Sequence, residues 1–266
     1  MSKYLTIFGN PVSHSISPLI HNHTIKALNE TGCYGRMELK NGSKIREKFF
    51  ELDIFGANIT VPFKEDAYMA CDEIYGIAKE IKAVNTIIKR ENKLLGYNTD
   101  APGFYEMIKE FSDIQNALIL GAGGTSKAIS SILRQNKIEP TILNRSEKRL
   151  EYFKTNGFQT FSWSNFQKNS FDIIINTTSA GLNDNNLPLE EKLLSELIES
   201  SKYCIDVIYN KTTPFLKLSK KFNKIHKDGS EMLLYQAVLA FEIFFDHKYS
   251  KDDIKKHMRY VFFNLL

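Results

Sequence analysis

Short apolar runs alternate with amphipathic stretches along the chain, a pattern typical of an α/β protein. Runs such as Tyr4–Phe8 and Ala117–Leu120 have the length of strands and are rich in aliphatic or aromatic residues. The stretches between them repeat apolar residues every three or four positions, and two examples that we predict to be helices are 43–52 and 231–245. In the second half of the chain, predicted strands alternate with loops and helices in a regular order, and this alternation predicts a parallel sheet.

The segment Asn116–Ala128 reads as a buried strand that passes through a glycine turn directly into a helix. Gly121 and Gly123 permit a tight turn whose backbone N–H groups can approach a pyrophosphate closely. The positive end of the helix that follows faces the same anion. Ser126 stands where a third glycine is usual, and glycine turns also serve packing alone, so this segment leaves both interpretations open.

The next predicted strand, Pro140–Leu143, favours the nucleotide interpretation. An NAD-binding motif places Asp or Glu at the end of this strand for the ribose 2′-hydroxyl, but here the chain continues with Asn144, Arg145 and Ser146, and Arg149 follows. A guanidinium is permanently charged and can hold a phosphate through two parallel hydrogen bonds, which indicates a 2′-phosphate and therefore NADP. The alternative is a solvated basic start to a helix, which the helix dipole disfavours.

Polar residues also gather at predicted strand and helix ends in the first hundred residues. Ser17 precedes Pro18 and is a candidate helix N-cap, whereas Ser15 has no obvious capping role, so the two hydroxyls are equally well explained as ligand-binding groups. Lys64 lies in the first turn of a predicted helix, where the dipole disfavours a cation, and is a candidate acid/base; an ordinary exposed lysine is the alternative. Asp100 precedes another predicted helix and is equally suited to capping it.

Composition and charge exclude several classes of function. The 35 basic residues are spread among 31 acidic ones, for a net charge of +4, which predicts a solvated surface and no nucleic-acid partner. Cys33, Cys71 and Cys204 lack metal-binding spacing and favour reduced thiols, and His21 and His23 point to different faces of a helix, so no metal site is predicted. The first residues run directly into the strand-like segment Tyr4–Phe8, which is too short and too β-branched to suit a signal peptide, and no apolar run approaches about 20 residues, so we expect a cytoplasmic protein without membrane contact.

The length of the chain and the position of the glycine turn predict two domains. The 266 residues are 42% hydrophobic, which is enough for a substantial core, and more than a hundred residues precede the turn at residue 121. We expect residues 101–229 to form a nucleotide-binding domain. Residues 1–100, with the C-terminal helices from 230 to 266 packed against them, are expected to form the other domain, with the active site in the cleft between the two.

Eight segments together resemble the shikimate dehydrogenase family. They occur in the family's order and at nearly its spacing between residue 4 and about residue 245. The segments are Ser15–Pro18, Asn58–Lys64, Ala83–Thr86, Asn98–Asp100, Gly121–Gly124, Asn144–Ser146, Asp206–Tyr209 and Gln236–Ala237.

The resemblance implies an NADP-dependent oxidoreductase that reduces 3-dehydroshikimate to shikimate reversibly, in chorismate and aromatic amino-acid biosynthesis. It also implies a doubly wound, Rossmann-like parallel sheet for NADP and an α/β substrate domain. Lys64 corresponds to the family's acid/base, and Asp100 to the carboxylate that orients it and binds a substrate hydroxyl. The implied substrate-binding residues are Ser15, Ser17, Thr60, Asn85, Asp100, Tyr209 and Gln236. The implied cofactor-binding residues are Gly121, Ala122, Gly123, Gly124, Thr125, Ser126, Asn144, Arg145, Ser146, Arg149, Val207 and Gly229.

The chain departs from the family's usual pattern at Tyr97, Ala101, Ser230-Glu231 and in a shorter loop between Tyr209 and Pro214. Alternatives within the enzyme class are a quinate/shikimate dehydrogenase with relaxed substrate or cofactor use and a methylenetetrahydrofolate dehydrogenase of similar build. A non-catalytic ligand-binding sensor is a third alternative, against which the presence of both Lys64 and Asp100 argues. The sequence leaves both a monomer and a homodimer open.

Overall fold

The computed structural model describes residues 3–264, which fall into two compact units. The described residues up to Gly103, together with those from Leu234 onward, form the first unit, and Phe104–Leu233 form the second. Helices α5 (Asp100–Ile108) and α10 (Ser230–Phe244) contribute residues to both units. The predicted domain limits fall at the first turns of these same two helices.

The first unit is built on a mixed sheet of six strands. In chain order these are β1 (Lys3–Gly9), β2 (Gly32–Glu38), β3 (Gly56–Ile59), β4 (Glu73–Ile74), β5 (Thr86–Arg90) and β6 (Lys93–Tyr97), and their order in the sheet is β2-β1-β3-β5-β6-β4. Strand β1 pairs in parallel with both β2 and β3, whereas β5 is antiparallel to β3 and β6. The carboxyl ends of β1 and β3 and the start of β5 therefore meet at one edge.

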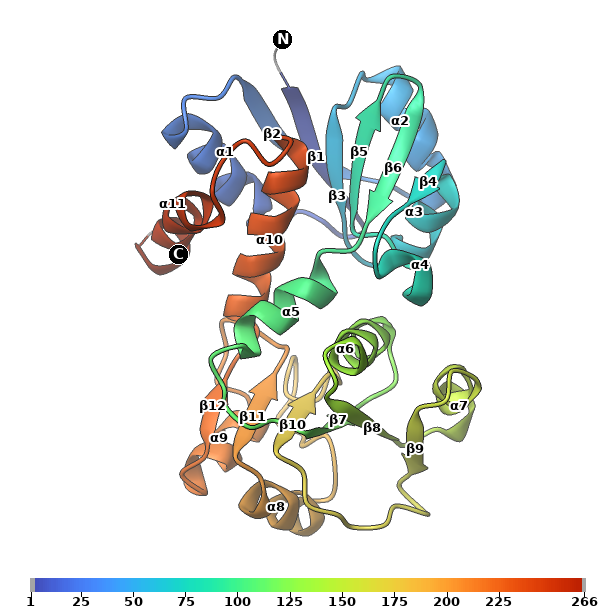
Figure 1. The fold of residues 1–266 in the computed structure, drawn as a ribbon, viewed down its shortest axis with the longest axis vertical. Coiled ribbons are helices and arrows are strands. Elements are labelled where there is room, and N and C mark those ends of the chain that lie inside the picture. The colour runs from blue at the N-terminus through green and yellow to red at the C-terminus, as the bar shows by residue number, and fades with distance from the viewer. Residues whose placement is uncertain (1–2, 265–266) are drawn as a thin grey trace. The chain divides into compact units, whose positions relative to one another are not determined.

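Helices cover both faces of this sheet (Figure 1). They are α1 (Ser17–Ala27), α2 (Ile45–Glu51), which a 3₁₀ turn at Gly42–Lys44 precedes, α3 (Lys64–Ala70), α4 (Ala78–Ile81) and α11 (Lys251–Asn264), in addition to α10. Helices α2 and α3 pack on one face through a buried cluster that includes Phe8, Phe49 and Ala67, and α1 and α10 lie on the other. The expected helices at 43–52 and 231–245 and the one that begins near Lys64 are confirmed.

Helix α1 begins one residue earlier than expected, and the prediction that Ser17 is its N-cap is wrong. The N-cap residue is Ile16, and no side chain caps the helix. Proline is tolerated in the first turn of a helix, where Pro18 lies, because a backbone N–H at these positions would have no partner within the helix. The N–H of Ser17 donates instead to Ser15 Oγ, at 3.3 Å, so the two serines form one local structure.

The second unit contains a six-stranded sheet in which every pairing is parallel. The strands are β7 (Asn116–Leu120), β8 (Glu139–Asn144), β9 (Gln159–Ser162), β10 (Ile173–Asn176), β11 (Tyr203–Asp206) and β12 (Ile225–Lys227), in the order β12-β11-β10-β7-β8-β9. Counted from β7, this is the order of a doubly wound, Rossmann-like sheet, as predicted. The winding reverses between β7 and β10, where such sheets bind their ligands.

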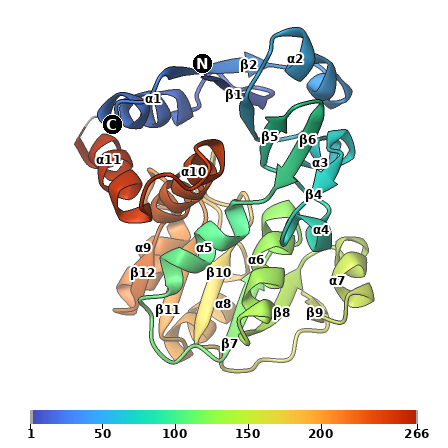
Figure 2. The same ribbon diagram turned by 45° about the horizontal axis from the view of Figure 1, so that its top comes forward.

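Helices α6 (Gly124–Gln135) and α7 (Glu151–Thr155) lie on one face of this sheet, and α8 (Glu191–Ser200) and α9 (Pro214–Lys221) lie on the other (Figure 2). Leu118 and Leu120 pack against α8 and α9, whereas Ile142 packs against α7. Successive strand residues face opposite sides, so strands covered on both faces are apolar throughout. The runs at 117–120 and 140–143 are thus confirmed as buried strands.

None of the helices within residues 3–264 combines the length and the apolar character needed to cross a bilayer. Over the same range, no group of three or more His, Cys, Asp or Glu side chains is arranged to hold a metal ion. Cys33, Cys71 and Cys204 are free thiols.

Candidate active site

Lys64 and Asp100 form an ion pair in the first unit. Lys64 Nζ donates a hydrogen bond to Asp100 Oδ2 over 2.7 Å. The side chains are 31% and 18% exposed, respectively, so the pair is shielded from bulk water on most sides yet open to a small molecule. A positioned ammonium beside a carboxylate can pass a proton to a reacting oxygen and keep its orientation while doing so.

Backbone hydrogen bonds fix the positions of the two partners. Lys64 is the first residue of α3, and its carbonyl accepts from the N–H of Val84 at 2.9 Å. The start of α5 is held by Asn98, whose Oδ1 accepts from the N–H of Ala101 and whose Nδ2 donates to the carbonyl of Ala83, both at 3.1 Å. Both helix starts are therefore attached to the residues just before β5, which brings the ammonium and the carboxylate together.

A buried network of side chains surrounds Asn85. This residue is 3% exposed, and its Oδ1 accepts from the N–H of Thr99 at 2.7 Å and from Thr86 Oγ1 at 3.0 Å. Asn58 Nδ2 donates to Thr86 Oγ1 at 3.1 Å, and Asn58 Oδ1 accepts from the hydroxyl of Tyr34 at 2.7 Å. These bonds fix the orientation of the Asn85 amide. Asn85 follows Val84, whose N–H donates to the Lys64 carbonyl, and it is bonded to Thr99, which precedes Asp100.

The two serines lie at the other end of the same network. Their hydroxyl oxygens are 3.2 Å apart, and the guanidinium of Arg36 donates to the carbonyl of Ser15 at 2.8 Å. Burial raises the pKa of Tyr34 well above its usual value, and hydrogen bonding with Ser17 and Asn58 opposes this effect only in part. Tyr34 therefore stays protonated and links the serines to the amides.

Thr60 and Gln236 belong to the same unit. Thr60 follows β3, and its N–H donates to the carbonyl of Phe8 at 2.8 Å. Gln236 lies on α10 where this helix approaches α5: a Cβ at Gly103 would lie 2.7 Å from the Gln236 nitrogen. The closeness of the two backbones thus requires glycine at position 103.

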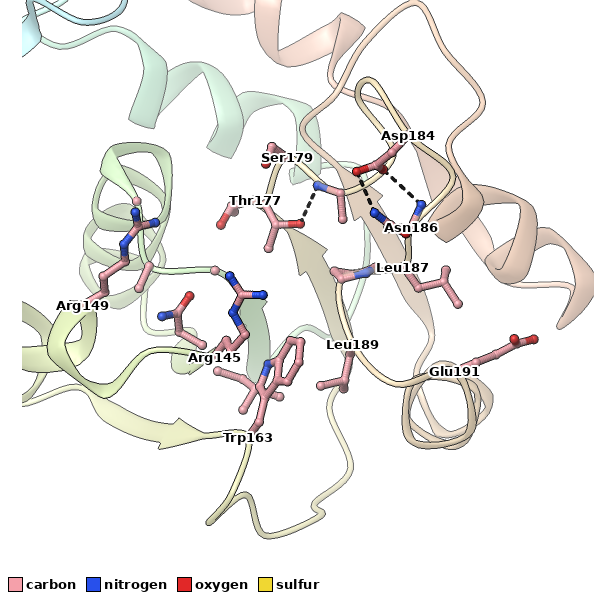
Figure 3. A pocket seen from close by; sticks show the side chains of 18 of the residues that line it. Arg145, Arg149, Trp163, Thr177, Ser179, Asp184, Asn186, Leu187, Leu189 and Glu191 are labelled. Atoms are coloured by element: carbon pink, nitrogen blue, oxygen red, sulfur yellow. Dashed lines mark hydrogen bonds between the residues drawn. The ribbon is translucent and has the colours of Figure 1, made fainter.

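The second unit has a cavity of about 760 Å³ at the carboxyl ends of its central strands (Figure 3). Of the expected cofactor-binding residues, Gly121, Ala122, Gly123, Asn144, Arg145 and Arg149 line it. The lining also includes Trp163, Thr177–Ala180 and Asp184–Leu189, which no sequence motif indicated. The cavity lies where the winding of the sheet reverses.

The glycine turn leaves room for a phosphate. Gly121 has φ +108°, and a Cβ on it would lie 2.7 Å from Thr177 Oγ1, so both its conformation and its surroundings require glycine. A Cβ added at Gly123 or Gly124 would meet no atom of the described residues within 4 Å, so this backbone faces open space at the start of α6. That arrangement suits a phosphate group.

Arg145 and Arg149 supply positive charge to the same cavity. Both are exposed, and across residues 3–264 neither guanidinium is paired with a carboxylate. The lining contains no Asp or Glu at the end of β8 that would suit a free 2′-hydroxyl. The residues present thus fit a dinucleotide that carries an additional phosphate.

Several expected cofactor-binding residues have structural contacts of their own. Ser126 is fully buried, and its hydroxyl donates to the carbonyl of Gly121 at 2.8 Å, which holds the turn. Gly124 and Thr125 lie beside it in the first turn of α6. The carbonyl of Ser146 accepts from Asn144 Nδ2 at 2.9 Å, which fixes the Asn144 amide.

Val207 and Tyr209 follow strand β11, and the buried Asp206, the last residue of the strand, holds this end in place. The Asp206 carboxylate accepts from Asn176 Nδ2 at 3.0 Å, from Thr213 Oγ1 at 2.6 Å and from a backbone N–H at 3.1 Å. Burial raises the pKa of Asp206, and these hydrogen bonds oppose the increase. Tyr209 is partly exposed after this fixed strand end.

Gly229 packs directly against Val207. A Cβ at Gly229 would collide with the Val207 carbonyl, and the N–H of Gly229 donates to the carbonyl of Ile208 at 3.0 Å. Glycine is therefore required at position 229 for the close approach of this segment to the end of β11.

Comparisons with known proteins agree with these features. A family model described as the shikimate dehydrogenase substrate binding domain matches residues 7–87, and one described as the shikimate 5'-dehydrogenase C-terminal domain matches residues 229–259. The chain is 48% identical to a shikimate dehydrogenase (NADP(+)) of Helicobacter hepaticus, over 96% of each chain. It is 43% identical to one of Helicobacter pylori strain J99, over 98% of this chain and 99% of the relative.

A solved structure has the same fold along its whole length. Shikimate 5-dehydrogenase from Thermus thermophilus, in complex with NADP(H) and shikimate, superposes with a TM-score of 0.84 at 29% identity, covering 97% of this chain and 98% of that one. Together with the Helicobacter relatives, it establishes that this chain belongs to the shikimate dehydrogenase family.

Proposed function

We propose that this protein is a shikimate dehydrogenase, which reduces 3-dehydroshikimate to shikimate with NADPH and catalyses the reverse reaction with NADP. The observation that carries this proposal is the partly buried Lys64–Asp100 ion pair, 2.7 Å long, in a chain 48% identical to a shikimate dehydrogenase (NADP(+)). A protein that only binds its ligand has no need of a positioned proton donor.

The Lys64 ammonium donates the proton that the carbonyl oxygen of the substrate needs as it becomes a hydroxyl. NADPH, when bound, supplies the hydride. Asp100 accepts hydrogen bonds from the ammonium and from a substrate hydroxyl, and thereby keeps the Lys64 ammonium aligned with the substrate. In the oxidation of shikimate the same lysine takes the proton back.

A carboxylate with several hydroxyls needs hydroxyl and amide partners. We assign this role to Ser15, Ser17, Thr60, Asn85, Asp100, Tyr209 and Gln236. The Asn85 amide is held by Thr99 and Thr86 through its oxygen, and one of its two N–H groups is left for substrate after a hydrogen bond to Thr99 Oγ1. Such preorganised groups lose little entropy on binding.

Arg145 and Arg149 would hold the 2′-phosphate of NADP, and the backbone of the turn at Gly121–Gly124 would hold the pyrophosphate. The remaining cofactor assignments are Thr125, Ser126, Asn144, Ser146, Val207 and Gly229. Residues 101–229 then form the NADP-binding domain, and residues 1–100 with 230–266 the substrate-binding domain. A cytoplasmic location and a monomeric or homodimeric state complete the proposal.

The proposal is tested by assaying the purified protein with shikimate and with quinate, each with NADP and with NAD, while the absorbance of the reduced cofactor is followed. We expect rapid turnover of shikimate with NADP, and a lower kcat/KM in the other three combinations. Rapid turnover of quinate would instead identify a quinate/shikimate dehydrogenase. Binding of shikimate without turnover with either cofactor would contradict the enzymatic function and favour a sensor.

A further inference from the structure

Trp163 lies in the cavity that we assign to NADP, and neither the family resemblance nor the glycine motif accounts for it. It is the only tryptophan of the chain, and its side chain is 45% exposed, within the lining of the cavity. Large exposed aromatic side chains in a concave site commonly mark a ligand contact.

The parallel pairing of β8 and β9 places Trp163 beside Arg145. Asn144 pairs with Ser162 at the last position of both strands, so Arg145 and Trp163 leave the sheet together at its carboxyl edge. The Arg145 guanidinium carbon lies 6.0 Å from the centroid of the indole ring. In Figure 3 the two side chains are next to each other, and the segment with Leu187 and Leu189 lines the same cavity.

The turn that carries Trp163 is held by hydrogen bonds on both sides. The N–H of Ser162 donates to Asn165 Oδ1 at 2.7 Å, and the N–H of Asn165 donates to the carbonyl of Ser162 at 3.2 Å. Ser162 is 2% exposed, and its hydroxyl donates to Glu147 Oε1 at 3.0 Å, on the segment that follows Arg145. The segments that carry Arg145 and Trp163 are therefore held together by one connected set of hydrogen bonds.

These observations define a flat aromatic face next to a guanidinium that no described carboxylate neutralises. We propose that Trp163 binds the adenine ring of the cofactor by stacking, while the adjacent Arg145 holds the 2′-phosphate of the same nucleoside. This inference rests on the proposed use of NADP and adds to it a residue that recognises the base. Stacking of a base on an aromatic side chain suits every purine, so Trp163 contributes affinity for adenosine and Arg145 supplies the choice of NADP over NAD.

The test uses adenosine 2′,5′-bisphosphate, which has the adenine and the 2′-phosphate but no nicotinamide. Because Trp163 is the only tryptophan, the tryptophan fluorescence of the full chain reports on this residue alone. Adenine does not absorb at the emission wavelengths of tryptophan, so a fluorescence change on titration requires contact with the indole or a change in its immediate surroundings. We expect saturable quenching by this ligand and no quenching by nicotinamide mononucleotide, which lacks adenine.

Calorimetric titration of variants gives the size of the contribution. Trp163→Leu should weaken the binding of adenosine 2′,5′-bisphosphate about 5- to 100-fold, as expected for the loss of one base–aromatic stack, while Trp163→Phe should stay within about fivefold of wild type. The affinity for nicotinamide mononucleotide should be unchanged in both variants. Circular dichroism of the variants confirms that they are folded, and the wild-type fluorescence titration does not depend on any variant.

Two results would overturn the inference in distinguishable ways. In the first, the wild type oxidises shikimate with NADP, but adenosine 2′,5′-bisphosphate binds it without a fluorescence change and binds Trp163→Leu with the same affinity. Trp163 then does not contact adenine, and the proposed function stands. If neither this ligand nor NADP binds the wild type, the assignment of the cavity to NADP is wrong, and the role of Trp163 falls with it.

Discussion

The buried imidazole of His21 makes the stability of the first unit depend on pH. His21 lies on α1 with its ring stacked on Tyr34, at a centroid distance of 4.4 Å and an angle of 5°. It is 1% exposed, and within residues 3–264 its Nδ1 has no hydrogen-bond partner. Burial lowers the pKa of His21 from 6.5 to about 3, because no neighbouring group compensates a positive charge there.

The sign and size of the effect follow from this shift. The unfolded chain binds a proton at His21 near its ordinary pKa, whereas the folded protein does not until the pH is about 3, so acid favours unfolding. The stability contributed by a neutral His21 is complete above about pH 7 and falls by about 1.4 kcal/mol for each pH unit between the two pKa values. At about pH 5 the loss is about 2 kcal/mol.

The comparison of His21→Phe with wild type isolates this contribution, because phenylalanine keeps the stacked ring and cannot be protonated. Urea unfolding of both proteins at about pH 7.5 and about pH 5 should show that wild type loses about 2 kcal/mol more than the variant between the two conditions. His23→Phe is a matched control on the same helix: His23 is half-buried against Tyr260, and the variant should follow wild type. Equal losses in wild type and His21→Phe would refute the reasoning.

Two further predictions concern the proposed binding sites. Arg145→Ala should lower kcat/KM for NADP about 10- to 100-fold and kcat/KM for NAD far less, because a charge-assisted contact with the 2′-phosphate is lost. The control variant Lys148→Ala should change neither value. Equal losses with both cofactors would mean that Arg145 does not recognise the 2′-phosphate. Tyr34→Phe and Asn58→Ala should each lower the free energy of unfolding, measured with urea, by about 1–3 kcal/mol. The double variant should lose less than the sum of the two single losses, because both variants remove the same hydrogen bond. Strictly additive losses would contradict this coupling.

The regular parts of the fold could be predicted because their sequence patterns are local. The apolar runs at 117–120 and 140–143 and the turn at Gly121 indicate buried strands of a parallel sheet, and the structure has that sheet. The two-residue β4, the four-residue α4 and the three-residue β12 escaped prediction, since elements this short show no periodicity.

The sites depend in part on contacts that a local pattern does not contain. Tyr34 reaches Asn58 only because β1 pairs with both β2 and β3, and nothing near Tyr34 in sequence indicates this partner. Trp163 reaches the cavity at the carboxyl ends of the second sheet through the register of β8 and β9. The sequence does contain an indication of this contact, because the single tryptophan follows the strand after the one that ends just before Arg145. Recognising the contact, however, requires knowing that these two strands are neighbours in the sheet.

The kcat of variants of the Lys64–Asp100 pair tests the central claim most directly. Lys64→Ala should lower kcat for shikimate oxidation about 10²- to 10⁴-fold with a much smaller change in KM, as expected for loss of a positioned acid/base. Asp100→Asn keeps the shape without the charge, so it should lower kcat and also raise KM. Because one hydrogen bond joins the two side chains, the double variant should lose much less than the product of the single losses. Fully multiplicative losses would contradict a shared proton-transfer role, and a Lys64→Ala protein that kept its kcat would show that Lys64 is not the proton donor.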